Sequence, residues 1–176
     1  MIDITDYRSK LNANLQQFVQ LLSPLSTEAR RFKQDNEWNL LEILEHVWLT
    51  EQTVVQMITK GSGSFSDDLE IFGFDKLKKV LVDYRHRKVK APQGMEPKGA
   101  EISLPDLLVK LHNGRNSLIN DIQSARLWMS AEVHVNPMLG EMTVIDWLHF
   151  ILLHSERHYL QMQEQMQRYN AVTKDL

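Results

Sequence analysis

Apolar residues recur at every third or fourth position over most of the chain, a spacing typical of amphipathic helices. The first such stretch covers residues 4–22 and stops at Pro24, because proline cannot continue a helix. The second begins at Asn39, which forms a capping pair with Glu42, and ends at Gly61. Its predicted apolar arc consists of Leu40, Leu44, Val47, Val54, Val55 and Ile58.

The second half of the chain contains two more helical stretches. Ser103 and Pro105 are typical of a helix start, and the apolar positions then continue to about residue 123. Thr143 and Asp146 form another capping pair, which opens a last helix that we expect to reach residue 169. Four long helices with one apolar stripe each predict an all-α four-helix bundle.

Glycine and proline residues, which interrupt regular structure, are concentrated between the second and third predicted helices. Residues 61–102 form a long irregular connection, within which Asp75–Tyr84 is predicted as a short helix. Connections of this length often carry function. A short helical turn at residues 26–32 and a turn at Asn136–Gly140 complete the expected elements. With no repeat or composition shift, residues 1–176 are predicted to form one domain.

Composition narrows the possible classes of protein. Apolar residues make up 43% of the chain and the formal charge is −3, which favours a globular protein and gives no general attraction for nucleic acid or membrane. Cysteine is absent, so any metal must be held by nitrogen or oxygen ligands. The acidic N-terminus does not resemble a signal peptide, and no apolar run is long enough to span a bilayer. We expect a cytoplasmic protein.

Three histidines are candidate ligands of a metal ion. His154 and His158 are four residues apart on the last helix, so both rings can reach one ion, and His46 lies on the flank of the second helix's apolar arc. Three protein ligands plus water are common in open metal sites. The alternative is that they are ordinary histidines at helix boundaries. His149 is not expected to be a ligand, because it points to another side of its helix.

Two other interpretations of polar residues are weaker. Metalloproteases of the zincin type have glutamate directly after the first histidine, but Ser155 occupies that position here. The long connection carries a basic cluster, which fits a solvated rim or an anion-attracting edge of a site better than a nucleic-acid surface, since the net charge of the chain is negative. The cluster consists of Lys76, Lys78, Lys79, Arg85, Arg87, Lys88 and Lys90.

Several segments together resemble the DinB/YfiT-like superfamily. They are residues 38–46, which end in His46, residues 136–143, and residues 154–161, which contain the H-x-x-x-H pair; Pro92 and Pro97 resemble the family's middle loop. The resemblance covers about residues 4–170. It implies a four-helix bundle that binds a metal ion through His46, His154 and His158.

The resemblance also implies a range of chemistry. Relatives include transferases and isomerases that use bacillithiol, mycothiol or glutathione. We therefore expect a metal-dependent transferase that uses a low-molecular-weight thiol and a small-molecule substrate, or a metal-dependent hydrolase. The alternative is a non-catalytic metal-binding or stress-associated bundle. Zn²⁺ and Ni²⁺ are both candidates, because both accept imidazole ligands.

Two further expectations concern Gln161 and assembly. Gln161 lies one turn beyond His158, where it either orients a ligand or water or is simply solvated. No general base or other catalytic residue can be assigned. Leu49, Phe150 and Leu153 lie outside a narrow apolar stripe, and exposed apolar patches usually mark contacts, so we expect a homodimer.

Overall fold

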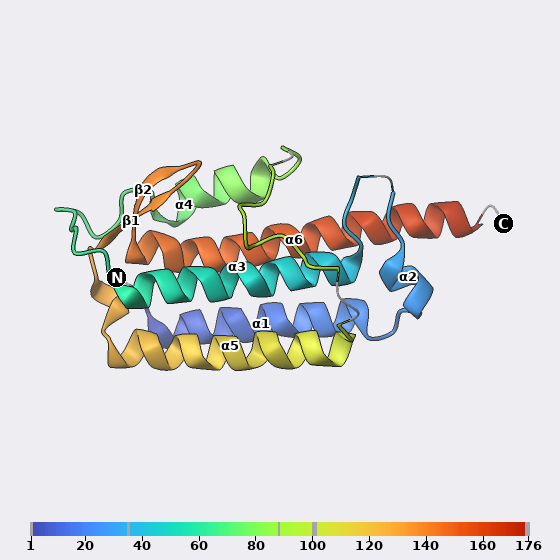
Figure 1. The fold of residues 1–176 in the computed structure, drawn as a ribbon, viewed down its shortest axis with the longest axis horizontal. Helices are drawn as coiled ribbons and strands as arrows, with labels where there is room; N and C mark the ends of the chain where they lie inside the picture. The colour runs from blue at the N-terminus through green and yellow to red at the C-terminus, as the bar shows by residue number, and fades with distance from the viewer. Residues whose placement is uncertain (1, 35, 88, 100–101, 175–176) are drawn as a thin grey trace.

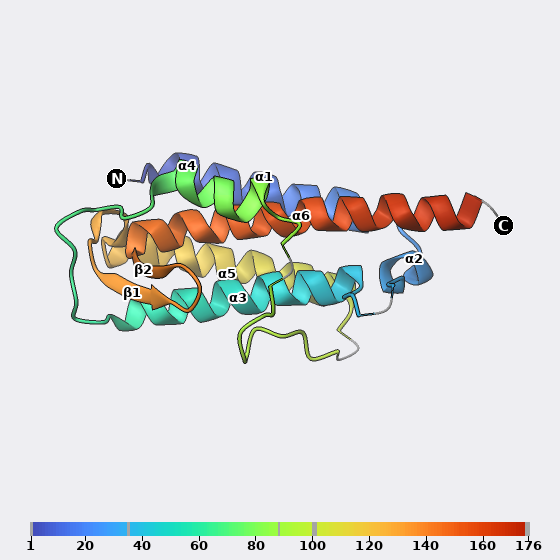
Figure 2. The ribbon, with the colours of Figure 1, turned by 90° about the horizontal axis from the view of Figure 1, so that it is seen from above.

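Four long helices lie side by side in the computed structural model, which describes residues 2–34, 36–87, 89–99 and 102–174 (Figure 1). Each of them packs against two others, in the cyclic order α1, α5, α3, α6 (Figure 2). The predicted all-α four-helix bundle is confirmed. The helices are α1 (Ile4–Leu22), α3 (Leu40–Lys60), α5 (Leu104–Ser124) and α6 (Val144–Lys174).

Polar side chains at the helix starts satisfy backbone N–H groups that have no partner within the helix. Asn39 accepts hydrogen bonds from the start of α3, while its own N–H donates to the Glu42 carboxylate at 2.7 Å. Ser103 accepts at 3.3 Å from the N–H of Asp106 in α5. Thr143 and Asp146, both buried, cap α6 reciprocally. The three helices therefore begin where the capping pairs predict.

Shorter elements connect the long helices. The predicted short helix in the long connection is present, but it begins earlier and changes from an α-helix to a π-helix. The predicted turn near residue 26 is also helical, whereas α6 extends beyond its predicted end. These short elements are α2 (Thr27–Arg31), α4 (Gly73–Lys78), the π-helix η1 (Lys79–Asp83) and the 3₁₀-helix η2 (Leu127–Met129).

A β-hairpin lies where the sequence predicted only a turn. Strands β1 (Val133–Asn136) and β2 (Gly140–Thr143) pair antiparallel in a two-stranded sheet. The Asn136 side chain accepts hydrogen bonds from two N–H groups within the turn, and Gly140 adopts a φ of 85°, which favours glycine. Four residues per strand are too few for an alternating pattern to stand out, so this hairpin was missed.

A polar layer divides the core of the bundle. One apolar cluster lies toward the hairpin end and includes Leu11, Val54, Ile122 and Ile151. The other, which includes Phe18, lies toward the opposite end. Buried polar residues from all four helices lie between the two clusters along the sequence of each helix, among them Asn14, Glu51, Arg115, His154, Ser155 and His158. His46 is also buried and lies next to this layer in α3, between Leu44 and Val47 of the second cluster.

Arg115 of α5 organises half of this layer. Its guanidinium donates to both carboxylate oxygens of Glu51 on α3, at 2.7 and 3.0 Å. It also donates to Asn14 of α1 at 2.9 Å and to Ser155 of α6 at 2.8 Å. Each long helix thus contributes one side chain to the network. Such networks favour one arrangement of the helices, because a shift would leave buried charges unpaired.

The apolar residues proposed for a dimer contact are less exposed than expected. Leu153 is fully buried in the core, so this part of the expectation is wrong. Leu49 and Phe150 are partly buried. The homodimer stays a prediction. Among the helices that the structure describes, none is long and apolar enough to cross a bilayer.

Replacing Arg115 by Met should lower the free energy of unfolding by about 3–5 kcal/mol, because it leaves the Glu51 carboxylate buried without a counter-charge. Urea unfolding followed by circular dichroism measures the change. The double variant Arg115→Met/Glu51→Met removes both charges and should recover most of the loss. A single variant as stable as the wild type would contradict the structural role of the network.

Tyr7 provides a pH-dependent test of the same region. Its buried hydroxyl donates to the Leu148 carbonyl at 3.0 Å. Burial, and then the Glu51 carboxylate, raise the pKa of Tyr7 well above its usual value. A raised pKa gives stability that is complete below the unfolded-state pKa, about 10, and is lost at higher pH. Tyr7→Phe should therefore lose less stability than the wild type between pH 9 and 11, and parallel unfolding curves would contradict this.

Candidate metal centre

Helices α3 and α6 bring the three predicted histidines together. One ring nitrogen of each can be chosen so that all three lie within 4.8 Å of one another. His46, His154 and His158 are 4%, 8% and 7% exposed, respectively, so the cluster is almost closed to solvent. Among the described residues, these three histidines form a group whose ligand atoms lie close enough together to hold one metal ion.

Hydrogen bonds define which ring nitrogen of His46 and of His158 faces the cluster. His46 Nδ1 lies 2.6 Å from the Met95 carbonyl oxygen, and His158 Nδ1 lies 2.8 Å from Gln161 Oε1. Both oxygens are acceptors, so both Nδ1 atoms carry the proton and donate it. The Nε2 atoms of these two rings are then left with free lone pairs. His158 Nε2 lies 3.1 Å from His154 Nε2.

Burial keeps the three imidazoles neutral. It is the largest cause that lowers the pKa of His154 well below its usual value, followed by the neighbouring His158 and His46. Burial and then His46 lower the pKa of His158 to about 3. Burial also lowers the pKa of His46. A neutral imidazole is the form that binds metal, so no proton has to leave at neutral pH.

The donor set fits a divalent transition metal. Two nitrogen ligands of a tetrahedral Zn²⁺ ion lie about 3.4 Å apart, given Zn–N distances of about 2.0–2.1 Å. The 3.1 Å between the Nε2 atoms of His154 and His158 is close to this separation. His154 Nδ1 is buried without a hydrogen-bond partner among the described residues. His154 therefore has a buried ring nitrogen that no described protein atom satisfies.

Aromatic side chains hold two of the rings in place. Trp38 lies against His46, with ring centroids 4.8 Å apart. Phe150 stacks on His154 at 5.2 Å and an interplanar angle of 22°. Phe150 was expected at a dimer contact, but the structure places it beside the candidate site. These rings restrict imidazole rotation and exclude water from the cluster.

The segment of residues 89–99 crosses α3 in Figure 1, and the Met95 carbonyl of this segment contacts His46. Met95 was not predicted as a site residue, because its contact uses the main-chain carbonyl, which every residue possesses. Gln161 was predicted as either a ligand-orienting or a solvated residue. It is hydrogen-bonded to His158, which is the arrangement expected of a group that orients a ligand.

Other candidate residues lie apart from the cluster. His149 packs against Phe74 and lies 3.6 Å from Glu70, and it is not part of the group of three histidines. In the basic cluster of the long connection, Arg85 pairs with Glu164 at 2.7 Å. Lys88 lies outside the described residues.

Comparisons with known proteins agree with the fold and with the family resemblance. The sequence model of the DinB superfamily matches residues 10–162. The uncharacterized protein YuaE of Bacillus subtilis (strain 168) is 29% identical over 128 residues, which are 73% of this chain and 76% of YuaE. The crystal structure of TT2238, a four-helix bundle protein, matches with a TM-score of 0.61 at 16% identity. The match covers 92% of this chain and 99% of that chain, so the shared fold extends over nearly the whole length of both.

Gln161→Leu should weaken metal binding by about 10- to 100-fold, because it removes the acceptor that holds His158 in its Nδ1-protonated form. A competitive chelator titration with Zn²⁺ measures the affinity. Gln163→Leu is the matched control, since Gln163 bonds to the Tyr159 hydroxyl on the same helix and not to a histidine. Equal affinities for the two variants would refute the role of Gln161.

Proposed function

Because the chain belongs to the DinB superfamily and buries three converging histidines, we propose that it binds one divalent metal ion through His46, His154 and His158. The observation that carries the proposal is that the Nδ1 atoms of His46 and His158 are each hydrogen-bonded to a protein oxygen. Met95 and Gln161 occupy the outer nitrogens of His46 and His158, which leaves the Nε2 atoms for a metal. Such outer hydrogen bonds accompany nearly all histidine ligands.

We further propose that the protein is a metal-dependent enzyme acting on a small-molecule substrate. Three neutral imidazoles leave a bound ion its full charge and an open position, which would lower the pKa of a thiol or water placed there. The chain has no cysteine, so a thiol would have to come from a low-molecular-weight compound. Thiol transfer to an electrophile is therefore the proposed reaction, with hydrolysis as its variant. Zn²⁺ and Ni²⁺ are the proposed ions.

One observation favours a second candidate, a bundle that binds metal without catalysis. The three imidazoles are at most 8% exposed, and the Met95 carbonyl from the segment of residues 89–99 contacts one of them, His46. A structural ion needs no access, whereas a catalytic ion must admit substrate. An enzyme of this kind would require residues 89–99 to move during turnover. A cytoplasmic location and a homodimer remain proposals that belong to either candidate.

The proposed site predicts the metal content of variants. His46→Ala and His158→Ala proteins should each bind the metal at least about 100-fold more weakly than the wild type, because two imidazoles hold an ion far less tightly than three. Elemental analysis after purification beside the wild type measures this. His149→Ala is the control and should keep its metal. Full metal content in both ligand variants would exclude the assignment.

The proposed reaction should require both a bound metal ion and a low-molecular-weight thiol. With a monohalobimane as electrophile, thiol consumption should need both the metal and the correct thiol from a panel of bacillithiol, mycothiol and glutathione. Chelation, or His154→Ala, should abolish the protein-dependent rate. Metal-dependent but thiol-independent ester hydrolysis would support the hydrolase instead. A filled site without turnover of any thiol or ester would favour the non-catalytic bundle.

A further inference from the structure

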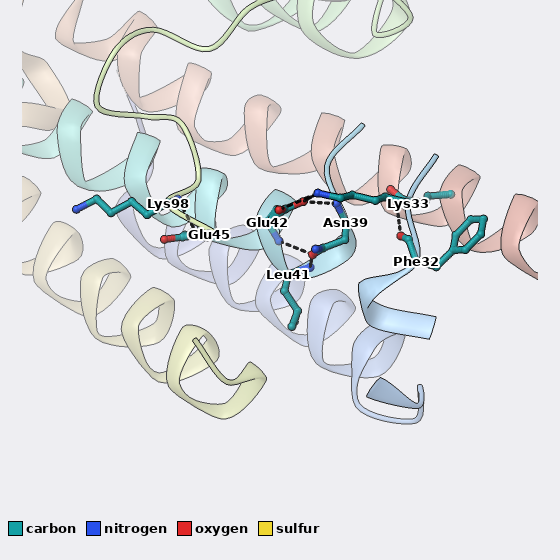
Figure 3. A network of polar contacts seen from close by, with 8 residues as sticks. Phe32, Lys33, Asn39, Leu41, Glu42, Glu45 and Lys98 are labelled. Atoms are coloured by element: carbon teal, nitrogen blue, oxygen red, sulfur yellow. Dashed lines mark hydrogen bonds and ion pairs between the residues drawn. The ribbon is translucent and has the colours of Figure 1, made fainter. Parts of the chain in front are cut away.

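Glu45 is a buried carboxylate beside the candidate metal centre. It directly precedes His46 in α3 and is only 3% exposed, although glutamate is rarely buried without a partner. Its hydrogen-bond partner among the described residues is the main-chain N–H of Lys98, which donates to Glu45 Oε2 at 3.2 Å (Figure 3). The Lys98 side chain is exposed to solvent.

Glu45 and His46 hold the same segment. The Glu45 carboxylate accepts a hydrogen bond from the main chain at Lys98, and His46 Nδ1 donates one to the main chain at Met95. Both contacts use backbone atoms, so they fix the path of the chain whatever its side chains are. Two consecutive residues of one helix thereby fasten residues 95–98 onto α3.

Residues 89–99 make few other hydrogen bonds. Within this described segment, Met95 N–H bonds to the Pro92 carbonyl at 3.1 Å, which shapes a turn but does not join the segment to a helix. Among the described residues, the hydrogen bonds that do join it to the helices are those to Glu45 and His46. Gly94 and Gly99 both have positive φ and would meet no atoms with an added Cβ, so no close packing holds them. The position of the Met95 carbonyl therefore depends on the contact at Glu45.

We propose that Glu45 is a positioning residue of the metal centre. By holding residues 95–98, it keeps the Met95 carbonyl against His46 Nδ1, and thereby keeps His46 Nε2 available to the other two histidines. The inference rests on the proposed metal-binding function, because binding a metal is the purpose of that orientation. Glu45 acts through Met95 and His46 and does not itself reach the ion.

The test compares variants that differ at this one hydrogen bond. Glu45→Met has a similar volume but no acceptor, whereas Glu45→Gln keeps an acceptor oxygen. Lys98→Ala is the matched control, because it changes the side chain and leaves the main-chain N–H in place. Lys98→Pro removes that N–H and leaves Glu45 intact. Circular dichroism first verifies that each variant has the helical content of the wild type.

Two measurements decide the outcome. In the metal-free protein, nitrogen-15 NMR should show that the His46 Nδ1 proton exchanges with water at least about tenfold faster in Glu45→Met and Lys98→Pro, since their Met95 carbonyl is no longer held in place. In chelator titrations, the same two variants should bind Zn²⁺ about tenfold more weakly, as expected when a ligand's outer partner is lost. Glu45→Gln and Lys98→Ala should resemble the wild type in both measurements.

Wild-type proton exchange in a folded Glu45→Met or Lys98→Pro variant would overturn the proposal. So would wild-type Zn²⁺ affinity in both of them. If the wild-type protein itself bound no metal, the proposed function would fail, but the proton exchange in the metal-free protein would still decide whether Glu45 positions His46. The two failures are therefore distinguishable.

Discussion

The buried polar layer across the middle of the bundle is the constraint on which the candidate site depends. Arg115 bonds to one side chain from each of the other three long helices, so the helices cannot slide without leaving its charge unpaired. Ser155, which belongs to this network, directly follows His154 in α6. Glu51 belongs to α3, which also carries His46. The network thus fixes the positions of α3 and α6 relative to each other along the bundle axis, and these two helices carry the three histidines.

Carboxylates also hold the long connection between α3 and α5 in place. Asp146 of α6 accepts hydrogen bonds from the N–H groups of residues 71–73, and Glu132 accepts from those of Ser62 and Gly63. Glu45 does the same for Lys98. A connection without regular structure must satisfy its own backbone donors, and here acidic side chains satisfy several of them. The connection can thereby place the Met95 carbonyl against His46 Nδ1.

The sequence predicted the helices and the three histidines because both depend on local spacing. Helical periodicity and capping pairs placed α3, and the i, i+4 rule placed His154 beside His158. It did not predict the network of Arg115 and Glu51, whose partners lie far apart along the chain and follow no spacing rule. Met95 was missed because its contact uses the backbone. Leu153 was expected at the surface, but the burial of α6 on several sides places it in the core.

X-ray absorption spectroscopy of the metal-loaded protein tests the central claim most directly. If His46, His154 and His158 bind the ion, the spectrum should show three imidazole nitrogens at about 2.0–2.1 Å from a bound Zn²⁺ ion, with one remaining position filled by a non-protein ligand. The spectrum of His158→Ala should retain at most two imidazoles. A wild-type spectrum with fewer than three imidazoles, or with carboxylate oxygens in their place, would contradict the account.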